Sequence, residues 1–412
     1  MTLFAAVCLL LILAKWLAQW WLERINERHV QAHRNEIPEA LRGATTPEAY
    51  AKSVNYTLAK GRFEKLELTW QTAALLAALF TGALPWFYRF FDVQSVWAGA
   101  AYVFCVSALL SLVDLPLEWH EQFHLEERFG FNTTTARLWW MDRLKGLLLG
   151  AAIGLPLLAF LFKLVDWLGA WWWFWGWVCF TVFQLVMMVV APILILPLFN
   201  KFTALPAGPL RERLLALGER AGFRAKDIQV MDGSKRSRHS NAFFTGFGRF
   251  RKIVIFDTLA EQLEASELEA VLAHEIGHYK KRHIPKMLAA SSAATLVGFY
   301  AISVLARQEW FYRAFGFHPG SVVPAFTLFA LLAGTATFWF SPLAHYFSRR
   351  YEYEADAYAA ELVKAAQPLV AALRKLNEKN LSNLTPHPFY SGFYYSHPTL
   401  LEREAALGEF EV

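Results

Sequence analysis

The chain is poor in charged residues and in cysteine. Of its 412 residues, 18% are charged and 56% are hydrophobic, whereas about a quarter of the residues in soluble proteins are charged. This composition excludes an ordinary soluble protein. The cysteines Cys8, Cys105 and Cys179 lie in apolar segments without metal-type spacing, so they predict neither a disulfide framework nor a metal site. The net charge of +5 is small and no basic stripe alternates with aromatics, which argues against a nucleic-acid partner.

Hydrophobic runs that can cross a bilayer, which takes about 20 mostly apolar residues as a helix, recur along the chain. Lys15 interrupts the first run, and SSAAT (291–295) softens the sixth. The N-terminal run lacks the basic start and clear cleavage site of a signal peptide, so we expect an uncleaved span. The predicted spans are 2–21, 69–91, 94–117, 146–166, 170–198, 287–308 and 322–346. The expected fold class is therefore a mainly α, polytopic membrane protein with seven transmembrane helices.

Lys and Arg are concentrated in alternate connections between these spans. Residues 22–68, 117–146, 201–286 and 348–412 are rich in both, and the other connections carry almost none. Since basic segments remain on the cytoplasmic side, we expect an N-terminus outside and these four segments inside. The membrane would be the plasma membrane in a bacterium and the endoplasmic reticulum in a eukaryote.

The connection after the fifth span has the pattern of a small α+β domain. LRERLLALGERAGF (210–223) has helical periodicity, and DIQVMDG, NAFFTGF and KIVIFDTL read as short strands. We therefore divide the chain into a membrane region at 1–198, an insert at 199–286, two further spans at 287–346 and a C-terminal segment at 347–412.

The segment LAHEIGHYKK contains His-Glu-x-x-His, a pattern that binds zinc and activates water. Ser266 and Glu269 predict a capping box at the start of its helix. His274 and His278 then lie on one face and can reach one ion, with Glu275 beside them to take a proton from a water that zinc has made acidic. His283 falls off that face, so we interpret it as a surface or interface group.

A catalytic zinc needs a third protein ligand, and SRRYEYEADAYAAELV (348–363) offers several carboxylates. Glu352 and Asp356 are spaced i, i+4, so one could bind the metal while the other holds a ligating histidine. Glu354 and Glu361 are the nearest competitors as ligand. On spacing alone, a solvated charged helix is an equal interpretation.

His-Glu-Ile-Gly-His, together with Ser-Arg-Arg-x-Glu-x-x-Ala-Asp, resembles the type I CAAX prenyl endopeptidases, which are membrane-integral zinc proteases of the gluzincin class. EERFGFN (126–132), LPLFNKF (196–202), HSNAFFTG (239–246) and YSHPTLLER (395–403) resemble further family segments in the same order. The resemblance therefore covers nearly the whole chain.

The resemblance implies a role for each matching residue. His274, His278 and Glu352 would bind one zinc ion, Glu275 would be the general base, and Asp356 would hold a ligating histidine.

Three further residues would act on the substrate. Asn241 would lie on the strand that takes the peptide. His397 would stabilise the oxyanion, and Arg403 would anchor a substrate group or brace the site. The implied fold is a barrel of seven tilted helices around a water-filled chamber, with the zinc site at its cytoplasmic side.

The leading hypothesis is a zinc endopeptidase that cleaves near the C-terminus of CAAX-type, possibly prenylated, proteins at a lipid membrane. Its partners would be a peptide or protein substrate and membrane lipid. The alternatives are a quality-control zinc protease of the heat-shock type, and a seven-span transporter or receptor with a vestigial zinc site.

Overall fold

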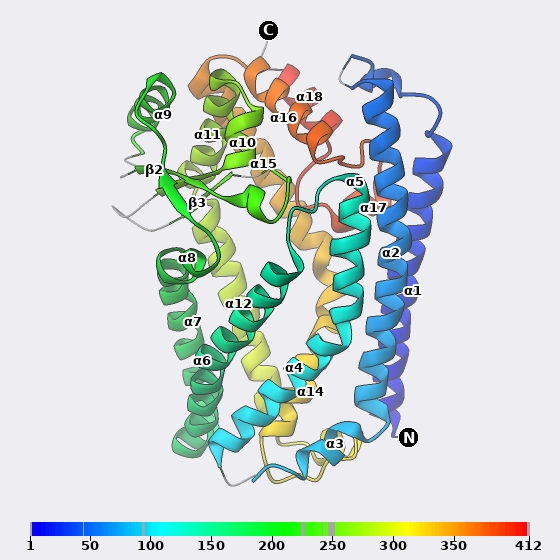
Figure 1. Ribbon diagram of the computed structural model, residues 1–412. Coiled ribbons are helices and arrows are strands. Elements are labelled where there is room, and N and C mark those ends of the chain that lie inside the picture. Colours follow the sequence, from blue (N-terminus) through cyan, green and yellow to red (C-terminus); the bar gives the residue numbers. More distant parts are fainter. Residues whose placement is uncertain are drawn as a thin grey trace.

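Long helices make up most of the structure, a computed structural model that describes residues 2–43, 45–92, 95–223, 227–240, 242–245 and 252–409. The longest are α1 (Leu3–Ala32), α2 (Pro47–Phe80), α4 (Val96–His120), α6 (Ala136–Leu168), α7 (Trp172–Val190), α12 (His283–Leu305), α14 (Val323–Thr337) and α15 (Ser341–Val363). α1 packs on α2, α4 on α6, and α7 on α12. They run between the end that holds the N-terminus and the end that holds the C-terminus (Figure 1). The fold is mainly α, as predicted.

Five helical segments among the described residues are long and apolar enough to cross a membrane. They are Leu3–Ala32, Val96–Phe129, Ala136–Phe199, His283–Leu305 and Val323–Val363. Gly169, whose φ of 51° favours glycine, divides the third segment into α6 and α7. Apart from one to three residues at the ends of four runs, these segments contain six of the seven predicted spans. The count of seven stays a prediction.

One predicted span is not a continuous helix, so this prediction was wrong in detail. In place of a helix over 69–91, α2 ends at Phe80, Gly82 takes a left-handed φ of 80°, and the short helix α3 (Ala83–Tyr88) follows. Glycine in this conformation terminates a helix, which hydrophobicity alone does not reveal. Short turns of another helix type lie inside two other predicted spans without ending them, a 3-10 turn at Phe338–Phe340 and a π turn at Ala191–Ile195.

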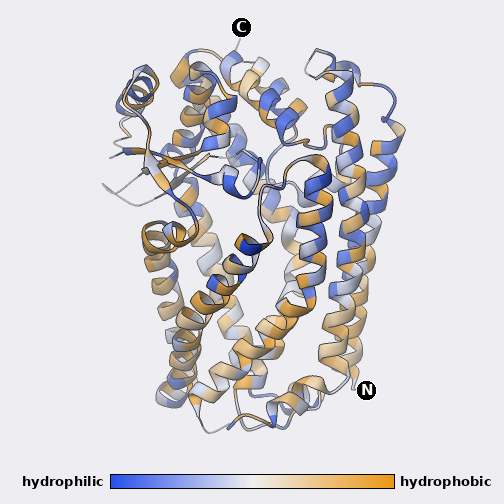
Figure 2. Ribbon diagram, viewed as in Figure 1, coloured by the Kyte–Doolittle hydropathy of each residue, from blue (hydrophilic) through white to orange (hydrophobic). Residues whose placement is uncertain are grey.

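Large apolar side chains on the long helices face outward. Leu10, Leu112, Leu148, Val186 and Val297 are each more than half exposed. Figure 2 shows that the helices are mostly hydrophobic toward the end with the N-terminus and more hydrophilic toward the other end. Soluble proteins rarely expose such a surface, whereas lipid tails cover it without cost.

A four-stranded sheet lies at the hydrophilic end (Figure 1). Its order is β1 (Phe202–Ala204), β2 (Asp227–Met231), β4 (Lys252–Phe256) and β3 (Ala242–Thr245), and only the β2–β4 pair is parallel. The three predicted strands are β2, β3 and β4, and the predicted helix is α9 (Pro209–Arg220). Among the described strands, β3 forms an edge of the sheet.

One apolar core joins this sheet to α11 (Ala265–Lys280), which carries the two histidines. Ile228 and Ile255 of the strands lie in the same buried cluster as Leu268 and Ile276 of α11. Each burial of such a side chain stabilises the fold by roughly 1.5–3 kcal/mol, so α11 is held firmly on the sheet.

Candidate active site

The helix with the two histidines begins at a capping box, but not at the predicted one. Glu264 and Glu267 exchange side-chain to backbone hydrogen bonds at the start of α11, where Ser266 and Glu269 were expected. Glu269 instead forms an ion pair with Arg213 of α9 at 2.5 Å. The cap lies two residues earlier than predicted, and α11 presents His274 and His278 together as predicted.

α11 and α15 pack with their backbones in contact. A side-chain carbon at Gly277 would lie 3.0 Å from both the Cα and the carbonyl oxygen of Ala355. Because the neighbouring atoms are backbone and cannot easily move, this close approach strongly favours glycine. The contact brings His274 and His278 of α11 opposite Glu352 of α15.

His274, His278 and Glu352 converge on one point. Their candidate ligand atoms all lie within 4.8 Å of one another. The His278 Nε2 atom is 3.2 Å from His274 Nε2 and 3.3 Å from Glu352 Oε1. Within the described part of the chain, the buried Glu352 Oε2 has no hydrogen-bond partner, although His274 Nε2 lies 3.4 Å away. Two imidazoles and an unsatisfied buried carboxylate oxygen fit a metal ion.

His274 is held from behind by a buried charged group. Its Nδ1 atom lies 2.7 Å from Asp356 Oδ1, and Arg403 donates to both Asp356 carboxylate oxygens at 2.8 and 2.5 Å. Burial alone would lower the pKa of His274, but the neighbouring carboxylates of Asp356 and Glu352 prevail and raise it to about 9. This geometry favours the bracing role for Arg403 over contact with a substrate.

Glu275 and His397 lie close to the three converging side chains. Burial raises the pKa of Glu275, which moves a carboxylate toward the range useful for a general base. His397 places its Nε2 atom 3.4 Å from Glu352 Oε1, and its side chain is 65% exposed. The arrangement can bind a metal and offers a base and an exposed hydrogen-bond donor beside it.

Asn241 lies outside the described residues, so its predicted role stays a prediction. The next residue, Ala242, begins β3 and lines a small apolar pocket together with Ile253, Val271 and Glu275. The start of the edge strand therefore lies close to the proposed base.

The buried position of His283 contradicts the prediction that it is a surface or interface group. It is 1% exposed, and its Nδ1 atom lies 2.9 Å from His278 Nδ1. Its Nε2 atom lies 3.1 Å from Glu354 Oε2, so Glu354 contacts His283 and not the two histidines of the site. Glu361, the other carboxylate considered as a ligand, is exposed. Arg282 adopts a left-handed φ of 57° that breaks the helix before His283. Helical periodicity misses this contact because it assumes no break.

Two family models match the chain. The model of the CAAX prenyl protease N-terminal region, with five membrane helices, matches residues 26–201, and that of peptidase family M48 matches residues 204–411. The chain belongs to peptidase family M48. The predictions of a metalloprotease and of an integral membrane protein are thereby confirmed.

The relatives of this M48 peptidase include CAAX prenyl protease 1 of Saccharomyces cerevisiae, 38% identical over 90% of this chain and 88% of the relative. The CAAX prenyl protease 1 homolog of Homo sapiens is 30% identical over 96% and 94%. The crystal structure of S. mikatae Ste24p matches with a TM-score of 0.93 and 34% identity over 99% of both chains. The predicted resemblance to the type I CAAX prenyl endopeptidases is confirmed.

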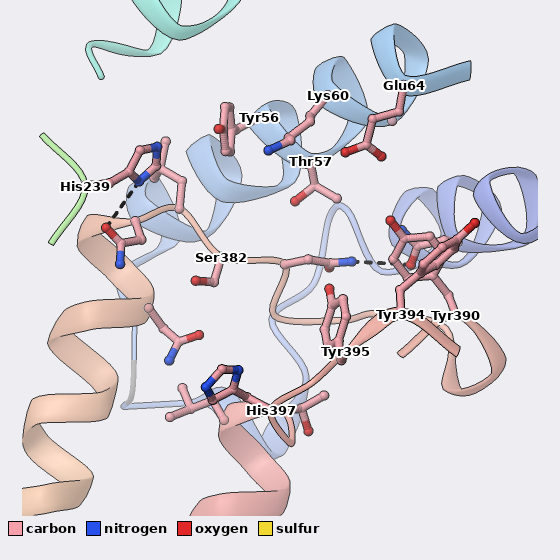
Figure 3. Close-up of a pocket in the computed structure, with 18 of the residues that line it drawn as sticks. Tyr56, Thr57, Lys60, Glu64, His239, Ser382, Tyr390, Tyr394, Tyr395 and His397 are labelled. Atoms are coloured by element: carbon pink, nitrogen blue, oxygen red, sulfur yellow. Dashed lines mark hydrogen bonds between the residues drawn. The ribbon is translucent and has the colours of Figure 1, made fainter. Parts of the chain in front are cut away.

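Figure 3 shows a polar cavity of about 820 Å³ that is lined in part by His397. Because His397 lies 3.4 Å from Glu352, the cavity reaches the candidate metal site of this M48 peptidase. Tyr56, Lys60 and Glu64 line it from α2, and His397 and Arg403 line it from the C-terminal segment. Predicted site residues from one end of the chain therefore share a cavity wall with the long helix α2 from the other end.

Proposed function

We propose that this M48 peptidase is a zinc endopeptidase that cleaves prenylated CAAX-type proteins near their C-terminus. The convergence of His274, His278 and Glu352 beside Glu275 carries the proposal. The relatives' names supply the substrate class, since they are CAAX prenyl protease 1 and its homologues.

His274, His278 and Glu352 would hold the zinc ion, which when bound acts as a Lewis acid and makes water a strong nucleophile near neutral pH. Glu275 accepts the proton of the attacking water and passes it to the leaving amine. His397 donates a hydrogen bond to the oxygen that becomes negatively charged. Asp356 orients His274, and Arg403 keeps Asp356 ionised and in place.

An extended peptide would bind along the edge strand β3. An exposed strand edge pairs with a peptide through backbone hydrogen bonds. Asn241, directly before Ala242, would hold the peptide near Glu275. The shared pocket of Ala242 and Glu275 supports this placement.

The membrane arrangement is part of the proposal. Seven spans would form a barrel around a chamber, with the N-terminus outside and the metal site on the cytoplasmic side. The polar cavity beside the site and the hydrophilic end of the molecule support a wet site close to lipid (Figure 2).

The division at 198 and 199 is supported by the two family matches, which meet between residues 201 and 204. We retain 1–198 and 287–346 as membrane regions, and 199–286 with 347–412 as the parts that build the site.

The substrate class is tested with purified, zinc-loaded protein and two peptides of one CAAX sequence, one farnesylated and one not. We expect release of a C-terminal fragment from the farnesylated peptide and much slower release from the other. Equal cleavage of both peptides would favour the quality-control protease of the heat-shock type. Cleavage of neither peptide would overturn the proposal.

A further inference from the structure

A chain of ring nitrogens runs from the metal-binding group to a surface carboxylate. His278 presents Nε2 toward Glu352 at 3.3 Å and Nδ1 toward His283 Nδ1 at 2.9 Å. His283 presents its other nitrogen to Glu354 at 3.1 Å. The Nδ1 atom of His278 and both nitrogens of His283 therefore each face one specific partner.

The position of each proton along this chain follows from the carboxylate at its end. A carboxylate accepts hydrogen bonds, so His283 carries a proton on Nε2 and donates it to Glu354. A neutral His283 then has a lone pair on Nδ1 and must accept from His278 Nδ1–H. The Nε2 atom of His278 is left with its lone pair directed toward the metal-binding group. This is the tautomer that a metal ligand requires.

Two basic side chains lie beside the Glu354 carboxylate. Arg350 lies 3.4 Å from one of its carboxylate oxygens, and Lys286 lies 3.8 Å from the other. Lys286 also stands over the Tyr351 ring, which stacks on His283 at a centroid distance of 4.4 Å and 15°. The acceptor and the ring of His283 are therefore both fixed in place.

The helix break at Arg282 makes the contact possible. In one continuous helix, residues five apart point about 140° from each other, so His283 could not reach His278. The left-handed φ of 57° at Arg282 ends α11 and starts α12 in a new direction. A non-glycine residue in this conformation is strained, and such strain concentrates at functional sites.

We propose that His283 and Glu354 are positioning residues that fix His278 as a neutral Nε2 ligand. The inference rests on the metal site of the proposed function and extends it. The two metal-binding histidines are then held differently, His274 by the Asp356 carboxylate and His278 by an imidazole that Glu354 orients in turn.

The test measures the zinc dissociation constant of the purified protein by competition with a chelator. Loss of such an orienting partner weakens metal binding by about 10–100-fold. His283→Phe keeps an aromatic ring on Tyr351 but loses both hydrogen bonds, so we expect its zinc binding to weaken by this factor. His283→Gln can accept from His278 and donate to Glu354, so we expect it to recover most of the affinity.

Two further variants separate positioning from folding. Glu354→Ala should weaken zinc binding in the same direction, whereas Glu361→Ala, an exposed carboxylate on the same helix, should leave it unchanged. The melting temperature in detergent reports folding. A His283→Phe protein that stays folded and binds zinc as tightly as the parent would overturn the proposal. So would a His283→Gln protein that binds no better than the Phe variant.

These outcomes are distinct from failure of the proposed function. If the parent protein binds no zinc, the metal site itself is wrong. If the parent binds zinc and cleaves peptide but His283→Phe is unaltered, only the positioning role is wrong.

Discussion

At the scale of single residues, the site depends on charges buried together. Asp356 is 1% exposed and Arg403 is 9% exposed, and each is the other's partner. The i, i+4 spacing of Glu352 and Asp356 left their roles open. The structure shows that Asp356 contacts His274. Spacing could not predict this, because the other partner of Asp356, Arg403, comes from a distant segment of the chain.

Removing Asp356 should therefore weaken the protein as a whole. Asp356→Ala leaves the buried Arg403 without its closest counter-charge, which costs about 3–5 kcal/mol of unfolding free energy. A clear fall in melting temperature in detergent is expected. A matched Glu361→Ala variant should melt like the parent, and equal melting temperatures for all three would contradict the argument.

A substitution of Glu275 tests the general-base role without changing the proposed metal ligands. Glu275→Gln preserves shape and all three proposed ligands but cannot take a proton. We expect peptide cleavage to fall by about 10²–10⁴-fold with an unchanged zinc content. Cleavage at the parent's rate would remove Glu275 from the role of base.

At the scale of elements, sequence patterns located most helices and strands but not their interruptions. Apolar periodicity found β2, β3, β4 and α9. It did not find the break at Gly82 or at Arg282, because each depends on the backbone conformation of a single residue. His283 was misjudged for this reason.

The α11–α15 contact is the element-scale feature that assembles the ligands. Gly277→Val would place side-chain carbons against the Ala355 backbone, where no flexible side chain can yield. Overpacking of this kind costs about 1–3 kcal/mol, and separating the helices would move Glu352 away from the histidines. We expect weaker zinc binding and a lower melting temperature. Gly334→Ala on α14 has open space around it and should change neither. Undiminished zinc binding by the Gly277 variant would contradict this account of the assembly.

At the scale of the whole molecule, composition predicted the membrane class, and charge asymmetry predicted the orientation. Spans alone could not predict the cavity beside the site, since it is formed by residues of α2 and of the C-terminal segment that are far apart in sequence.

The orientation is tested by single cysteines in a protein without its three native ones. Glu309 lies in a connection between two apolar segments, and Glu361 lies on the helix that carries the proposed metal ligand Glu352. Both side chains are exposed. In sealed vesicles of known orientation, an impermeant thiol reagent should label Glu309→Cys from outside and Glu361→Cys from the cytoplasmic side only. Labelling of both from one side would refute the orientation.

The central claim is that this chain hydrolyses peptides with a metal held by His274, His278 and Glu352. The most direct measurement is cleavage of the farnesylated CAAX peptide by purified protein before chelation, after complete removal of metal, and after return of one equivalent of zinc. The account predicts cleavage, then none, then recovery. Cleavage that continues at full rate in the metal-free protein would contradict it.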